Sequence, residues 1–211
     1  MNMSREFVTL TKRGVVVLAL TLGASGVVVS AQEEAREDSK ETFWATPVVM
    51  GTTNPPLART GARSTTQINI TRWTSDQERE ALFAELVENG QEGLVKALRK
   101  QEETGFVRSS GQGSRSGFPS ERLRYAREIR DGDKRRIILA LDRPISFAEA
   151  ARRPRWNDYD LTFITLDIDD EGKGEGQALV GVQLKLNMES KTLEVENFGS
   201  QPVRLMNVRK P

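Results

Sequence analysis

The chain contains no cysteine and no histidine among its 211 residues. The lack of cysteine excludes disulfide bonds, thiol nucleophiles and zinc sites with cysteine ligands. The lack of histidine removes the commonest general base, the serine–histidine triads and most transition-metal sites. Catalysis would have to rely on Asp, Glu, Lys, Tyr or Ser, so a protein that is not an enzyme is the favoured expectation.

Neither sign of charge dominates the chain. It holds 31 Lys and Arg against 30 Asp and Glu, which gives a formal net charge of +1. A chain this close to neutral shows no overall bias towards nucleic acid or a membrane surface. Nucleic acid is therefore not an expected partner.

The N-terminus has the pattern of a secretory signal peptide. A positive region with Lys12 and Arg13 precedes the apolar run Val15–Leu22, and Val29–Ala31 places small or branched residues before a cut at Gln32. The alternative is an uncleaved membrane anchor, but glycines and serines break the apolar stretch soon after the run. We expect export to the periplasm or the extracellular space, with no transmembrane segment left after cleavage.

Three parts of the chain follow from this pattern. Residues 1–31 are the predicted signal peptide, and residues 32–66 read as a flexible tether rich in charged residues, Pro, Gly, Ser and Thr. Within the tether, Phe43–Met50 is too apolar for a pure linker, and we expect it to dock as an added edge strand. Residues 67–211 are predicted to form one domain.

Four segments near the C-terminus predict an antiparallel meander. They alternate apolar and polar residues and are bounded by Gly, Asn, Asp or Ser. They are Leu161–Asp169, Ala178–Met188, Thr192–Phe198 and Pro202–Val208. Further strands are expected at Gln67–Trp73 and in a hairpin at Arg122–Arg130 and Lys134–Leu141, joined by Asp131-Gly132.

Two short helices are expected between the first strand and the hairpin. Ser75 and Glu78 form a capping box, Asn89-Gly90 ends the first helix, and Gln91–Glu103 carries the second. Their single apolar stripe needs a sheet to cover. The predicted fold class is α+β: an antiparallel sheet of about seven or eight strands with a two-helix hairpin packed on one face.

The middle of the chain is the strongest candidate for binding. Residues 108–155 hold 13 Lys or Arg against 6 acids, whereas residues 160–200 hold 9 acids against 3 Lys. Arg122, Arg124 and Arg130 share a parity along one strand, which predicts a common solvent face for an anionic glycan, lipid head group or phosphate. The alternative is that these charges pair with neighbouring acids.

Arg155, Trp156 and Tyr159 form a second candidate ligand surface. They lie together in the predicted loop before the meander. Aromatic residues beside Arg on a loop suit contact with a ligand or another protein. The alternative is that the aromatic rings belong to the core and its rim.

Two acidic motifs are candidates for metal binding or acid/base chemistry. Asp167, Asp169 and Glu171 followed by Gly172 resemble the first half of a calcium loop, but Ala178 stands where the loop needs Glu. An acidic hairpin tip is the alternative to this calcium site. Asp158, Asp160 and Asp167 could supply an acid/base pair of the glycosidase kind, although nothing in their spacing fixes a separation.

Residues 67–210 resemble a family of secreted bacterial proteins of unknown function. The resemblance rests on Ile70–Trp73, Gly90-Gln91, Asp142–Phe147 and Ser200–Leu205. It implies export and a single domain. It implies no activity, ligand or site residue, because none is assigned to that family.

These patterns favour an exported binding or envelope-associated domain without enzymatic activity. Its partner would be an anionic envelope component or another protein. Two alternatives remain at this point: a His-free hydrolase built on carboxylates, and an extracellular domain stabilised by calcium.

Overall fold

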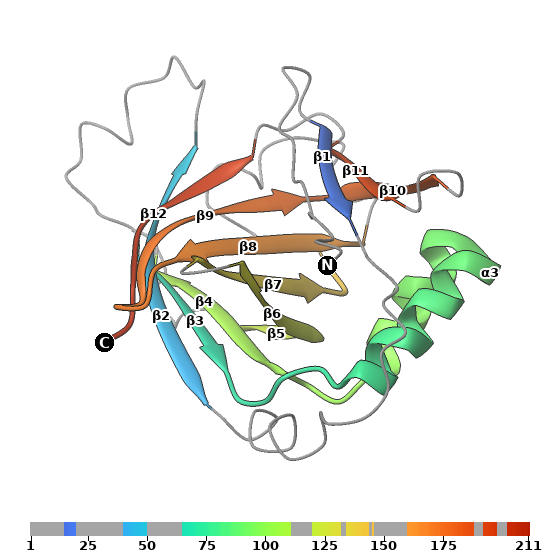
Figure 1. Ribbon diagram of the computed structural model, residues 1–211, viewed down its shortest axis with the longest axis horizontal. Helices are drawn as coiled ribbons and strands as arrows, with labels where there is room; N and C mark the ends of the chain where they lie inside the picture. Colours follow the sequence, from blue (N-terminus) through green and yellow to red (C-terminus); the bar gives the residue numbers. More distant parts are fainter. Residues whose placement is uncertain are drawn as a thin grey trace, which may run out of the picture.

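A computed structural model describes residues 15–19, 40–49, 65–110, 120–131, 134–143, 145, 160–187, 192–197 and 202–211. Nine strands form one antiparallel sheet that curves until it nearly closes into a barrel (Figure 1). The strands are β2 (Glu41–Val49), β3 (Thr65–Ile70), β4 (Gly105–Ser110), β5 (Ser120–Leu123), β6 (Tyr125–Asp131), β7 (Lys134–Leu141), β8 (Thr162–Ile168), β9 (Lys173–Val180) and β12 (Val203–Arg209). Their order across the sheet is β5-β4-β3-β2-β12-β9-β8-β7-β6.

Arg124 marks the point where the sheet nearly closes. It is the single residue between β5, which pairs with β4, and β6, which pairs with β7. Its backbone N–H donates to the Ala140 carbonyl of β7 at 2.9 Å. The chain therefore passes directly from one end strand of the sheet, β5, to the other, β6. The two edges of the sheet lie next to each other at this point, as in a nearly closed barrel.

The inner face of the curved sheet is packed with apolar side chains. Alternate residues of each strand point inwards, because successive side chains on a strand face opposite ways. Phe43, Ile68, Ile137, Leu139, Ile164, Leu166 and Leu205 are all 0% exposed. Burying one such side chain fully stabilises the fold by about 1.5–3 kcal/mol, so this interior is the main source of stability.

One helix, α3 (Asp76–Lys100), covers part of the outer surface of the sheet. Ser75 caps its first turn, and the Glu78 side chain bonds back to the Ser75 N–H, which completes the expected capping box. The helix packs its apolar stripe against the ends of β8, β9 and β10. The buried residues of this contact are Leu82, Leu86, Leu94, Val95, Leu98, Leu161, Leu179, Val182 and Leu184.

A second sheet of three strands lies beside α3. It contains β1 (Val15–Ala19), β11 (Thr192–Asn197) and β10 (Val182–Asn187), in that order. The Gln91 side chain of α3 bonds to the edge of β10: Nε2 donates to the Val182 carbonyl and Oε1 accepts from the Leu184 N–H, both at 2.8 Å. The amide thus stands in for a paired strand at that edge.

The predicted α+β fold with a two-helix hairpin is wrong. The chain is mostly β, and the described residues contain one helix. Gly90 adopts φ 64° and ψ −160°, so it kinks α3, but helical residues resume at once on its far side. The Asn89-Gly90 pattern signals a break in helical geometry without showing whether a linker follows it.

The predicted four-strand meander is also wrong. Gly181 has a φ of 63°, and it separates β9 from β10, which leaves for the second sheet. As a result β12 pairs with β9 on one side and with β2 on the other, instead of with β11. The strand β2 contains the segment expected to dock at an edge, and it lies between β3 and β12 inside the sheet.

Candidate functional site

The structure brings two of the predicted ligand residues together and leaves a third apart. Arg122 of β5 forms an ion pair with Glu103 at 2.9 Å, and Arg124 donates through Nη1 to the Gln101 carbonyl at 3.0 Å. Both arginines therefore contact the segment that follows α3. Arg130 lies at the far end of β6 and binds Glu128.

The other predicted ligand residues, Arg155, Trp156 and Tyr159, lie outside the described residues.

The predicted metal ligands each have a partner, in β7 for Asp167 and at the start of β9 for Asp169 and Glu171. Asp167 binds Arg136, and Asp169 Oδ1 accepts the Lys173 N–H at 2.9 Å. Glu171 accepts from Lys173 Nζ at 2.7 Å, and this hydrogen bond is the main cause of the raised pKa of Lys173. Across the described part of the chain, no three acidic side chains converge as a metal site would require, and calcium binding stays a prediction.

Asp142, which directly follows β7, is the centre of the candidate site. Its side chain is only 4% exposed, and three arginine side chains surround its carboxylate. Arg143 Nε lies 3.6 Å from Oδ1, and the Nε atoms of Arg99 and Arg124 each lie 3.9 Å from Oδ2. We call Asp142, Arg99, Arg124 and Arg143 the Asp142 cluster.

Three different elements carry the arginines of the Asp142 cluster. Arg99 comes from the last turn of α3, Arg124 joins β5 to β6, and Arg143 follows β7. Arg99 also binds Asp160 at 2.6 Å, and Arg143 lies 3.7 Å from Glu121. The cluster therefore sits where the helix meets the end of β7 and the start of β8.

Two buried atoms of the cluster make no hydrogen bond within the described structure. They are Asp142 Oδ1 and Arg124 Nε. The distances of 3.6–3.9 Å from Asp142 to the arginines allow electrostatic attraction but exceed hydrogen-bonding distance. A buried carboxylate oxygen that accepts no hydrogen bond is energetically costly, so a donor that reached it would stabilise it.

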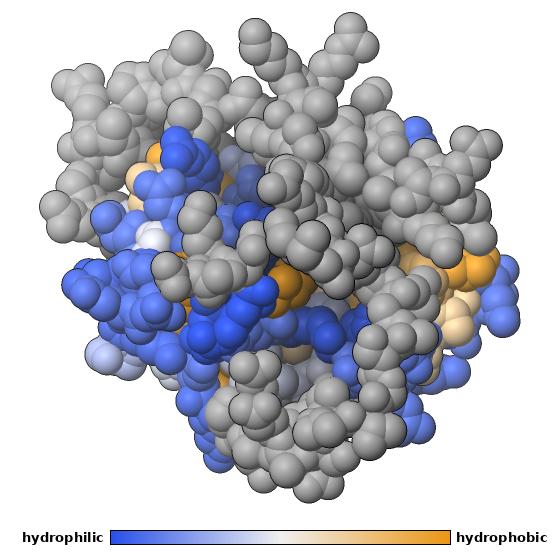
Figure 2. Space-filling view, viewed as in Figure 1, coloured by the Kyte–Doolittle hydropathy of each residue, from blue (hydrophilic) through white to orange (hydrophobic). Residues whose placement is uncertain are grey.

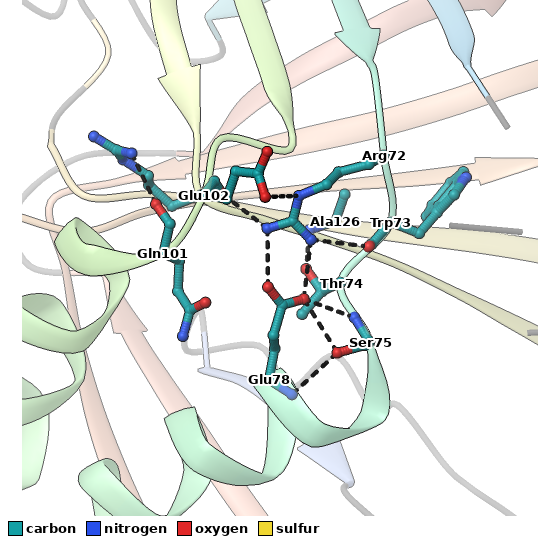
Figure 3. A network of polar contacts seen from close by, with 9 residues as sticks. Arg72, Trp73, Thr74, Ser75, Glu78, Gln101, Glu102 and Ala126 are labelled. Carbon is teal, nitrogen blue, oxygen red and sulfur yellow. Dashed lines mark hydrogen bonds and ion pairs between the residues drawn. The ribbon is translucent and has the colours of Figure 1, made fainter. Parts of the chain in front are cut away.

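Arg72 holds the neighbouring part of α3 in place (Figure 3). Its Nη1 and Nη2 donate to the two carboxylate oxygens of Glu78 at 3.0 and 2.9 Å, a bidentate pair, and Nη2 also donates to the Glu102 carbonyl at 3.0 Å. Glu78 lies in the first turn of α3 and Glu102 follows the last turn. One guanidinium thus fixes both ends of the kinked helix, and with them the Gln101 carbonyl that orients Arg124.

A second group of charges crosses the interior at the opposite end of the strands. Arg135 Nη2 of β7 contacts Glu41 Oε1 of β2 and Glu128 Oε2 of β6, each at 2.7 Å. The strands β2 and β7 are separated by β12, β9 and β8 in the sheet, so the Glu41–Arg135 pair spans the interior. The Arg135 guanidinium also lies over the Trp73 ring, 5.7 Å from its centroid.

The Glu128 carboxylate, which converges with Glu41 on Arg135, is held as an ion. Burial raises the pKa of Glu128, but hydrogen bonds from Arg130 and Arg135 and the charge of Arg135 outweigh that effect, so its pKa is lowered. Burial lowers the pKa of Arg135, but the hydrogen bonds and charges of Glu41 and Glu128 outweigh this effect, so the pKa is raised overall. A hydrolase needs a carboxylic acid that keeps its proton near neutral pH, and this arrangement promotes the opposite state.

Sequence reasoning identified Arg122 and Arg124 but missed Arg99, Asp142 and Arg143 as members of one site. Asp142 and Arg143 stand out only as charged residues directly after a predicted strand. Arg99 follows the apolar stripe of α3, and no local pattern shows that it meets β7.

No family model, curated protein or solved structure matched the chain. The resemblance to a family of secreted bacterial proteins therefore stays a prediction. Among the described residues, no helix is both long enough and apolar enough to span a membrane.

Proposed function

We propose that the chain is an exported binding domain without enzymatic activity, and that it recognises an anionic component of the cell envelope. The binding surface we assign is formed by Arg99 and Arg143, which lie beside the buried carboxylate of Asp142, and by Arg122, which binds Glu103 just after the end of α3. Export rests on the predicted signal peptide.

The main support for the proposal is the solvent exposure of these arginine side chains. The side chains of Arg99, Arg122 and Arg143 are 49%, 59% and 52% exposed, whereas the carboxylate of Asp142 is buried below them. Glu103 and Asp160, the partners of Arg122 and Arg99, are about half exposed, whereas Glu121, the partner of Arg143, is partly buried. Exposed pairs of this kind are weak, so an anionic ligand can compete for the guanidinium groups.

The described surface as a whole is consistent with polar recognition. The described surface in Figure 2 is mostly hydrophilic, and the exposed large hydrophobic side chains of the described residues are Val48 and Val87. Neither belongs to the Asp142 cluster. Guanidinium groups bind carboxylate, sulfate and phosphate groups through paired hydrogen bonds, which suits them to such a ligand.

Charge reversal tests the proposal. In the Arg99→Glu plus Arg143→Glu variant, we expect the affinity for immobilised polygalacturonate at low salt to fall on the order of tenfold, because two exposed cationic contacts are replaced by repulsion. The measurement is the dissociation constant at several salt concentrations.

The matched control is Arg136→Glu plus Arg204→Glu. Arg136 is partly exposed and Arg204 is exposed. They pair with Asp167 and Glu175 elsewhere on the sheet, and their reversal changes the net charge equally. The control should bind within about twofold of the wild type. An equal loss in both variants, or no binding by the wild-type chain, would exclude the proposed surface.

A further inference from the structure

Asp142 has a property that a simple anion site does not need. It places a negative charge, 4% exposed, among the three arginines that would attract an anion. A carboxylate there weakens the attraction for any ligand that is only an anion. The residue therefore demands an explanation beyond charge attraction.

The explanation is that one carboxylate oxygen of Asp142 lacks a hydrogen-bond donor within the described part of the chain. An ionised carboxylate can only accept hydrogen bonds, and Oδ1 accepts none from the described residues. The arginines around it are held by other partners: Arg124 by the Gln101 carbonyl, Arg99 by Asp160 and Arg143 by Glu121. Because Oδ1 is buried, a ligand hydroxyl can donate to it only when the half-exposed Arg143 side chain, whose Nε lies 3.6 Å away, turns aside to contact the ligand's charge.

We propose that the Asp142 cluster binds an acidic polysaccharide whose sugar carries both an anionic group and a neighbouring hydroxyl. The anionic group contacts the exposed guanidinium groups of Arg99 and Arg143, and the hydroxyl donates to Asp142. This inference rests on the proposed function and specifies its ligand class. Asp142 is the residue that separates a hydroxyl-bearing anion from a bare one.

The observations favour a polysaccharide over a membrane. Proteins that bind membrane surfaces usually combine basic residues with apolar side chains that enter the lipid. The cluster and its immediate partners are instead charged or polar: Glu121, Asp160 and the Gln101 carbonyl. Sugars present charged groups and hydroxyls at fixed separations, which matches an arginine beside a buried carboxylate.

A comparison of two polymers tests the inference with the full chain. Polygalacturonate carries carboxylates with neighbouring hydroxyls, whereas polyacrylate carries carboxylates without hydroxyls. At one ionic strength we expect the wild-type chain to bind polygalacturonate at least about tenfold more tightly, since only this polymer satisfies Asp142. The readout is the ratio of the two dissociation constants.

The Asp142→Asn variant tests whether Asp142 causes the preference for polygalacturonate over polyacrylate. The substitution removes one negative charge and adds a donor, so we expect the ratio to fall to about one, with binding to polyacrylate unchanged or tighter. Asp160→Asn is the matched control, because it removes an equal charge from an exposed partner of Arg99. The control should keep the wild-type ratio.

The outcomes separate the inference from the proposed function. Equal binding of both polymers by the wild-type chain overturns the inference and leaves the proposed anion surface intact, whereas binding of neither overturns both. Tighter binding to phosphatidylglycerol vesicles than to polygalacturonate overturns the assignment to a polysaccharide. If circular dichroism shows that Asp142→Asn does not fold, the ratio of the two dissociation constants of the wild-type chain alone tests the inference.

Discussion

Arg135 shows how a single buried charge can organise the interior of a sheet. It accounts for the position of two carboxylates that approach from strands on different sides of the interior, Glu41 and Glu128. Burying charged groups is costly, but removing one partner is more costly, because the others are left buried without compensation. The aromatic ring of Trp73 beside the guanidinium adds a further favourable contact.

We therefore expect Arg135→Leu to lower the free energy of unfolding by about 3–5 kcal/mol, measured by urea denaturation. Arg136→Leu is the control, because this adjacent side chain is only partly buried and pairs with exposed Asp167. The control should lose less than about 1 kcal/mol. Similar small losses in both variants would show that the charges inside the sheet are not coupled.

Glu128 predicts how stability depends on pH. Its folded-state pKa lies below the ordinary value of 4.5, chiefly because hydrogen bonds from Arg130 and Arg135 overcome the opposing effect of burial. A depressed carboxyl pKa contributes stability that is fully present above pH 4.5 and is lost as pH falls through the folded-state pKa. The melting temperature should decrease as the pH is lowered from 4.5 through the folded-state pKa. Glu128→Gln should make this decrease smaller. An unchanged pH profile in Glu128→Gln would contradict this assignment.

At the scale of elements, Gly93 explains how α3 can kink and remain compact. A Cβ at this position would lie 2.3 Å from Asn89 Cβ and 3.0 Å from the Glu85 carbonyl oxygen, which belongs to the first half of the helix. The absence of a side chain lets the two halves approach. Gly90 provides the kink itself through its positive φ.

Gly93→Ala should destabilise the fold by about 1–3 kcal/mol in thermal denaturation, because the added methyl group forces the halves of α3 apart. This sign is opposite to helix propensity, which favours Ala over Gly by about 1 kcal/mol. Glu92→Ala, at the exposed neighbouring position, should change stability by less than about 0.5 kcal/mol. A stabilised Gly93→Ala variant would exclude close contact between the halves.

The same element shows where sequence reasoning succeeds and where it stops. The capping box at Ser75 and Glu78 was confirmed, because both partners lie within one turn and the pattern is local. The Asn89-Gly90 signal correctly marked a break, but the contact of Gly93 with Glu85 depends on how the two halves meet. Gly181 fits the alternation of a single strand, yet its positive φ sends β10 to another sheet.

At the scale of the whole molecule, the apolar alternation identified most strands but not their neighbours. Pairing of β12 with β2 joins segments about 160 residues apart, and no local pattern specifies such a partner. The Asp142 cluster likewise depends on contacts between distant segments, since its arginines come from α3, the β5–β6 junction and the end of β7. Parity on one strand predicted a flat basic face, whereas closure of the sheet placed Arg124 under the helix and Arg130 at the far end.

The position of β2 gives a test of the whole fold. This strand pairs with β3 and β12, buries Phe43 completely and supplies Glu41 to the charges that cross the interior. A chain that starts at Gln67 lacks all three contributions and leaves two unpaired strand edges. We expect it to show no cooperative melting transition, whereas a chain that starts at Gln32 should melt cooperatively.

Addition of a synthetic peptide of residues 40–50 provides the control for this truncation. Because β2 is held by backbone pairing on both edges, the peptide should restore a cooperative transition to the shorter chain, and a variant peptide with Phe43→Asp should not. Circular dichroism during heating measures both. Cooperative melting of the shorter chain alone, within a few degrees of the longer one, would mean that residues 67–211 form a domain without β2.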